Sequence, residues 1–139
     1  MILKAGFIFL SQMICPTLYI DKTGEMGRGV FTKAPIPANT IVEASPVIVM
    51  SPEERKLLDQ TLLHDYIFEW GQDNKQCCMA LGFVAIYNHS YKSNCEYEMN
   101  FESETIRIKT IREIEAGEEL FINYNGDWNN DKKLWFEAK

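Results

Sequence analysis

The chain's 139 residues are enough for one domain and leave no room for a second hydrophobic core. A content of 46% hydrophobic and 24% charged residues is that of an ordinary globular domain and argues against a disordered chain. The net charge of −6, without a Lys/Arg cluster, argues against direct nucleic-acid binding and suits a basic partner, although a charge of this size is equally expected if it only keeps the protein soluble.

The first residues of the chain are apolar. Residues 1–14 carry a single charged side chain, Lys4, and loosely imitate a secretory signal. The apolar stretch at residues 5–10 is too short to span a membrane, and no small-x-small cleavage motif follows it. We therefore expect residues 1–16 to be an N-terminal extension, arising from a misplaced start or forming a first strand on the core. We expect neither secretion nor membrane association.

The next segments alternate between short strands and turns. The clearest helix start is at residues 51–54, where Ser51 can cap, Pro52 suits the first helical position and Glu54 completes a capping box. The helix should include Leu57 and Leu58. The other patterns predict a small, mainly β domain with one or two helices. Strand-like segments are residues 17–20, 30–32, 40–44, 46–50, 64–71, 105–111 and 120–124.

Three motifs stand out, and they follow one another in a particular order. A Gly-x-Gly turn precedes a strand, an Asn-His-Ser box ends an apolar run at residues 79–86, and a Gly-Glu-Glu-Leu motif opens a short strand that ends on a tyrosine. In this order and combination they resemble the SET domain, the protein-lysine methyltransferase fold, over residues 18–124. The similarity is greatest to the compact bacterial and viral members, which lack flanking zinc modules. The motifs are Gly27-Arg28-Gly29, Asn88-His89-Ser90 and Gly117-Glu118-Glu119-Leu120 with Tyr124.

The resemblance implies a mainly β SET fold (a β-clip) of several short sheets, with a crossed-over pseudoknot formed by two of these segments. Residues 17–126 would form the domain. Tyr91 stands where larger members carry a zinc-binding cysteine, and no cysteine follows Cys95. A zinc-bearing C-terminal module should therefore be missing, and we expect the aromatic tail at residues 127–139 to close the lysine channel instead. The candidate side chains are Trp128, Leu134, Trp135 and Phe136.

The cysteines show no metal-binding spacing. None of the four belongs to a Cys-x-x-Cys array with a second such array or a histidine pair, so we expect no structural zinc and no other metal. Buried thiols in a reducing compartment are the simpler interpretation. We expect the protein in the cytoplasm, or in the nucleus of a eukaryotic host.

The resemblance also implies roles for individual residues. Tyr124 would be the catalytic residue, with its hydroxyl beside the methyl group and the attacking amine. Asn88 and His89 would contact the cofactor, His89 in part through its backbone. Gly27-Arg28-Gly29 would let the backbone approach the methionine end of the cofactor, since a Cβ would block that approach or forbid the turn. From spacing alone, a strand-end tyrosine and a bare turn are the commoner explanations, and a structural histidine is the alternative for His89.

Tyr66 and Tyr97 are candidates for the walls of the lysine channel. Aromatic walls suit an alkyl stem and a methylated ammonium through packing and cation–π attraction. Each is equally well explained as a core aromatic on a strand. The acidic stretch at residues 96–104 could flank a substrate groove, but an exposed hairpin is its usual explanation.

The implied reaction transfers a methyl group from S-adenosylmethionine to a lysine side chain of a basic, histone-like protein, and S-adenosylhomocysteine is the product. The main alternative is a catalytically silent SET-like module that binds peptide or cofactor; the intact Asn-His box and terminal tyrosine favour the enzyme. An unrelated small β-barrel is the third interpretation. A compact domain of this kind could complete its channel by forming a homodimer through the tail.

Overall fold

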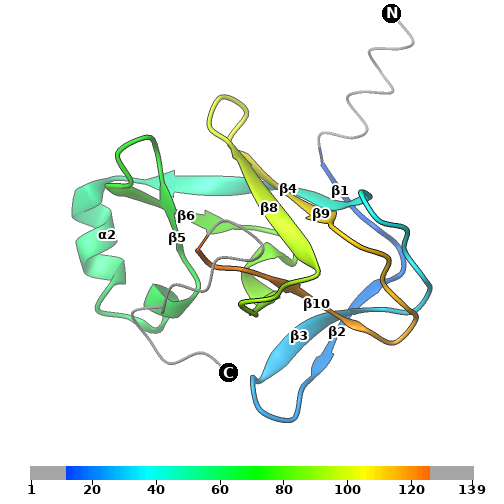
Figure 1. Ribbon diagram of the computed structural model, residues 1–139. Coiled ribbons are helices and arrows are strands. Elements are labelled where there is room, and N and C mark those ends of the chain that lie inside the picture. The colour runs from blue at the N-terminus through cyan, green and yellow to red at the C-terminus, as the bar shows by residue number, and fades with distance from the viewer. Residues whose placement is uncertain (1–11, 126–139) are drawn as a thin grey trace, which may run out of the picture.

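The computed structural model describes residues 12–125, which form two curved sheets with a short helix at one end (Figure 1). The larger sheet has the strand order β5-β6-β4-β9-β8, with β1 also paired to β4, and the smaller has the order β2-β3-β10-β7. The expected mainly β architecture of several short strands is confirmed. The elements are β1 (Met13–Ile14), β2 (Leu18–Lys22), β3 (Arg28–Thr32), β4 (Ile41–Met50), α2 (Pro52–Leu58), η1 (Leu62–Asp65), β5 (Phe68–Trp70), β6 (Gln76–Ala80), η2 (Val84–Ile86), β7 (Asn88–His89), β8 (Cys95–Asn100), β9 (Thr105–Thr110) and β10 (Glu119–Ile122).

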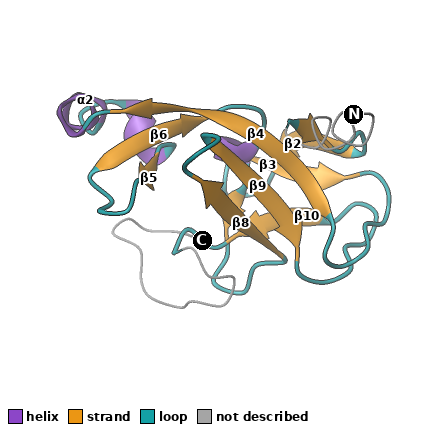
Figure 2. Cartoon of the chain, turned by 90° about the horizontal axis from the view of Figure 1, so that it is seen from above, coloured by secondary structure: helices purple, strands orange, loops and turns teal. Residues whose placement is uncertain are grey.

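Strand β4 is the long curved strand that crosses the molecule (Figure 2). Its first half pairs with β9 and its second half with β6, in both cases antiparallel. The sequence predicts two strands separated at Ser45, and this is wrong: the strand is continuous through Pro46. Pro46 lies at the point along β4 where pairing with β9 ends and pairing with β6 begins. Its missing N–H therefore interrupts neither set of hydrogen bonds.

Strand β10 lies between β3 and β7 in the smaller sheet. It pairs antiparallel with β3, where Leu120 faces Val30, and parallel with β7, where Phe121 faces Asn88. The side chain of Asn94 also accepts a hydrogen bond from the Phe121 N–H at 2.8 Å. The Gly-x-Gly strand, the Asn-His box and the last motif are thus brought side by side, although they are far apart in the sequence.

The helix begins as its sequence predicts. Ser51 accepts a hydrogen bond from the Glu54 N–H, and the Glu54 carboxylate accepts one from the Ser51 N–H. The strand expected at residues 64–71 is only partly correct. Residues 62–65 form a 3₁₀ turn whose first residues are held by the Thr61 hydroxyl, and only Phe68–Trp70 pairs as a strand. A Thr cap is a local backbone interaction that competes with strand formation.

The four cysteines are free thiols, three of them buried, and Cys15 is partly exposed. Within residues 12–125 no group of three or more His, Cys, Asp or Glu side chains could hold a metal ion. No helix in this part of the chain is long and apolar enough to cross a membrane. Met13–Ile14 pairs with β4, so the end of the expected N-terminal extension joins the larger sheet. Residues 1–11 and the aromatic tail at residues 127–139 lie outside the described residues.

Candidate active site

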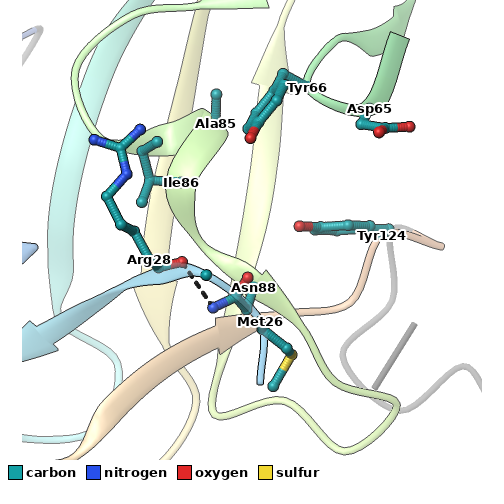
Figure 3. A pocket seen from close by; sticks show the side chains of 9 residues that line it. Met26, Arg28, Asp65, Tyr66, Ala85, Ile86, Asn88 and Tyr124 are labelled. Atoms are coloured by element: carbon teal, nitrogen blue, oxygen red, sulfur yellow. Dashed lines mark hydrogen bonds between the residues drawn. The ribbon is translucent and has the colours of Figure 1, made fainter. Parts of the chain in front are cut away.

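A cavity of about 310 Å³ opens where the three motifs meet (Figure 3). This volume lies at the lower end of the range of roughly 300–1,000 Å³ that is typical of small-molecule sites. Its walls come from the β2–β3 turn, the end of η1, the segment that leads into β7, and Tyr124, which lies two residues after β10. The lining residues are Met26, Gly27, Arg28, Asp65, Tyr66, Ala85, Ile86, Asn88 and Tyr124.

Tyr124 forms hydrogen bonds with two other tyrosines. Its hydroxyl donates to the Tyr87 carbonyl at 2.7 Å, and its own carbonyl accepts from the Tyr97 hydroxyl at 3.3 Å. Burial, followed by the neighbouring Tyr66, raises the pKa of Tyr124 to about 12. The phenol is therefore neutral at physiological pH. Because its proton is donated to the Tyr87 carbonyl, the phenol oxygen acts toward the cavity as a hydrogen-bond acceptor and not as a donor.

Asn88 is oriented by two acceptors. Its Nδ2 donates to the Arg28 carbonyl at 3.0 Å and to the Glu119 carboxylate at 2.8 Å. These bonds use both amide hydrogens, so only Oδ1 is left to receive a hydrogen bond from a ligand. The Glu119 carboxylate is half-buried, and burial raises its pKa, while the bond from Asn88 acts in the opposite direction.

The two glycines of the first motif are needed for different reasons. Gly27 has a φ of +71°, which side chains rarely adopt, and no described atom lies within 4 Å of the position of an added Cβ. A Cβ on Gly29 would instead lie 2.3 Å from Oε2 of Glu119 and 2.9 Å from Nδ2 of Asn88. The expected reason, close approach of a ligand, fits the open space at Gly27. At Gly29 the close neighbours are the protein's own side chains, and Gly29 does not line the cavity.

The His89 ring lies next to that of Tyr124, with centroids 5.1 Å apart, and does not line the cavity. Its side chain is only 3% exposed, and its Nδ1 accepts a hydrogen bond from the Tyr124 N–H at 3.0 Å. A backbone N–H can only donate, so the proton of this neutral ring is assigned to Nε2, for which residues 12–125 offer no hydrogen-bond partner. Burial lowers the pKa of His89, which keeps the ring uncharged. Its side chain thus positions the backbone of Tyr124.

The two candidate channel tyrosines differ in placement. Tyr66 lines the cavity, and its hydroxyl and that of Tyr124 point into the same space (Figure 3). Tyr97 does not line it. Its ring packs edge-on against Phe68 with centroids 5.5 Å apart, and its hydroxyl contacts the Tyr124 backbone. The sequence pattern indicates that Tyr97 lies on a strand, but it does not indicate how that strand packs against Tyr124.

Sequence reasoning missed four of the lining residues. Ala85 and Ile86 belong to the apolar run before the Asn-His box, and Asp65 precedes Tyr66, so adjacency to a predicted site residue was a usable signal. Met26 had no such signal, because its place depends on the conformation of the β2–β3 turn.

Comparison with known proteins connects this geometry to a family. A protein-family model for the SET domain matches residues 27–125. The chain is 39% identical over 121 residues to the Schizosaccharomyces pombe protein named "Histone-lysine N-methyltransferase, H3 lysine-37 specific", covering 86% of this chain and 77% of that protein. A crystal structure of a candidate histone methyltransferase from Plasmodium falciparum superposes with a TM-score of 0.60 at 29% identity, covering 80% of this chain and 99% of the other. The ATXR5 SET domain bound to histone H3 superposes with a TM-score of 0.66 at 18% identity, covering 85% of this chain and 61% of the other, which supports the fold alone.

Proposed function

The chain belongs to the SET domain family and is a protein-lysine methyltransferase. From this premise we propose which residues carry the reaction and what substrate the enzyme takes. The observation on which the proposal depends is the placement of the Tyr124 phenol. Its proton is donated to the Tyr87 carbonyl at 2.7 Å, and its oxygen shares a cavity with Gly27 and Asn88.

SET methyltransferases use S-adenosylmethionine, and the cavity residues fit such a group. Gly27 leaves open space beside the backbone, and Asn88 offers a single oriented acceptor that suits an amine or hydroxyl donor. Arg28 supplies a cation at the cavity wall, which suits the carboxylate of an amino acid. When bound, the cofactor supplies a methyl group on a sulfonium sulfur and leaves as S-adenosylhomocysteine.

The protein's own residues then have to deliver an uncharged amine. A free lysine has a pKa of about 10.4, so at neutral pH it carries a proton that must be lost before it can attack. Entry into a partly buried cavity favours the neutral form. The Tyr124 oxygen can accept a hydrogen bond from the amine and so align its lone pair, and Tyr66 supplies an aromatic wall for the alkyl stem. Neither step requires a nucleophilic side chain.

The substrate we propose is a lysine in a basic, histone-like protein segment. The net charge of −6 favours a basic partner, and Asp65 places a carboxylate at the cavity wall. The name of the S. pombe relative assigns that protein a histone H3 lysine. The free thiols suit a reducing compartment, the nucleus or the cytoplasm. Completion of the channel by the tail or by a second copy stays a prediction.

The test is methyl transfer from radiolabelled S-adenosylmethionine to histone H3. Tyr124→Phe should keep cofactor binding, measured as the rise in melting temperature that the cofactor produces, because the residue contributes only one polar group. Turnover should fall by roughly 100-fold, the scale for removing one preorganised polar group from a reaction centre. Tyr19→Phe, on β2 and outside the cavity, is the matched control.

Unchanged turnover in Tyr124→Phe would refute the role of the phenol. A wild-type protein that binds the cofactor but labels no lysine would support the silent binding module instead.

A further inference from the structure

Glu43 is a buried carboxylate that the proposed reaction does not use. It lies on β4, its side chain is 0% exposed, and burial raises its pKa. Its oxygens accept hydrogen bonds from the Ser45 hydroxyl at 2.6 Å, the Phe83 N–H at 2.7 Å and the Tyr87 hydroxyl at 2.9 Å. Placing an acid in a core is costly, and an apolar side chain would pack there at less cost.

The partners of Glu43 lead directly to the active site. Tyr87 is 1% exposed, and it is bound at both ends: its hydroxyl donates to Glu43, and its carbonyl accepts the proton of the Tyr124 phenol at 2.7 Å. One residue therefore connects the buried carboxylate to the phenol. Asn88, whose amide faces the cavity, follows Tyr87 directly.

The segment between β6 and β7 is also packed tightly against the carboxylate. Gly82 has a φ of +63°, and a Cβ there would lie 2.3 Å from Oε2 of Glu43 and 2.3 Å from the Ser45 hydroxyl. The Phe83 N–H is bound to the same oxygen. Glu43 thus holds this segment at its beginning, through Phe83, and at its end, through Tyr87.

We propose that Glu43 is a positioning residue for methyl transfer: it fixes Tyr87, and the Tyr87 carbonyl fixes the direction in which the Tyr124 phenol points. The inference rests on the proposed role of Tyr124. A displaced phenol would still be buried and neutral but would align the amine poorly, and small displacements at a reacting centre cost large factors in rate. Glu43 itself touches neither substrate nor cofactor.

The test compares two variants, each of which removes one of the hydroxyl groups that donate a hydrogen bond to Glu43. Glu43→Gln is less useful, because its amide would face three donors and the core could fail to fold. Tyr87→Phe keeps the ring and the backbone carbonyl. Ser45→Ala is the matched control, since the Ser45 hydroxyl binds the other oxygen of the carboxylate. Both should lower the melting temperature to a similar extent.

The decisive measurement is the ¹³Cζ resonance of Tyr124 in protein labelled at its tyrosine rings, assigned with Tyr124→Phe. We expect Tyr87→Phe to shift this resonance, to lower kcat about 10-fold with unchanged affinity for S-adenosylmethionine, and to alter the ratio of mono- to dimethylated product. Ser45→Ala should change none of these three when kcat is calculated per folded protein, because the hydrogen bond from Tyr87 to Glu43 stays in place.

An unshifted resonance in Tyr87→Phe, or an equal shift in Ser45→Ala, would overturn the inference. Because the resonance is measured without turnover, a wild-type protein that fails to methylate any lysine would refute the proposed function while the resonance still decides the role of Glu43.

Discussion

Gly29→Ala should damage both stability and cofactor binding, because the added methyl group has no room. An added Cβ would lie 2.3 Å from Oε2 of Glu119, whereas ordinary contacts begin near 3.4 Å. The carboxylate must therefore withdraw by about 1 Å. That movement breaks the 2.8 Å hydrogen bond by which Glu119 orients the Asn88 amide.

The size of the effect follows from that lost bond. Hydrogen bonds to charged groups contribute about 1.5–3 kcal/mol net. Alanine limits the unfolded chain more than glycine and returns about 0.4–1 kcal/mol, since Gly29 does not need a positive φ. A net loss of about 1–2 kcal/mol should lower the melting temperature by roughly 4–8 °C. An Asn88 amide that is held only by the Arg28 carbonyl should weaken cofactor binding by about 10-fold.

Denaturant unfolding and isothermal titration with S-adenosylmethionine measure the two effects. Gly24→Ala is the matched control, because no described atom lies within 4 Å of its added Cβ and its φ is not positive. Adding Glu119→Ala to Gly29→Ala should remove most of the steric cost, so that the two substitutions couple strongly in a double-mutant cycle. A Gly29→Ala protein as stable as wild type, or an additive cycle, would refute this reasoning.

Three further results are expected. Because the pKa of Tyr124 is about 12, the methylation rate should rise with pH between 7 and 9 as the substrate lysine loses its proton, and a falling limb there that disappears in Tyr124→Phe would contradict the neutral phenol. The hydrogen bond from Arg112 lowers the pKa of Glu118 below 4.5, so the contribution of this carboxylate to stability is present above that pH and is lost as the pH falls through the lower folded value. Between pH 7 and pH 3 the melting temperature of Glu118→Gln should therefore fall by less than that of wild type. An equal fall would argue against the stabilising pair. Burial raises the pKa of Cys78 to about 12, so a thiol reagent should label the partly exposed Cys15 first in the native protein, and early labelling of Cys78 in peptide mapping would indicate local opening.

The features that sequence reasoning predicted best are local. Ser51 and Glu54 are three residues apart, and their capping box forms because both partners lie in one turn. The convergence of Gly27, Asn88 and Tyr124 on one cavity was expected from the order of the motifs, not from any local pattern. Family resemblance carried that long-range information.

What could not be predicted depends on contacts between distant residues. Glu43 looks like an ordinary strand residue, and only the fold brings it to Tyr87, which is 44 positions away. Pro46 reads as a strand break, but the exchange of partner strands makes it harmless. The contact between the Tyr97 hydroxyl and the Tyr124 carbonyl likewise depends on how β8 packs next to β10, and the role of Tyr97 in a channel wall stays a prediction.

The central position of β10 has a consequence for how activity is gained and lost. The walls of the cavity belong to different stretches of chain, and β10 joins two of them by pairing with both β3 and β7. Most contacts of this kind close long loops, which slows folding and makes assembly cooperative. A partly folded molecule would therefore hold no half-built catalytic centre, and loss of enzymatic activity under denaturant would coincide with the global transition rather than precede it.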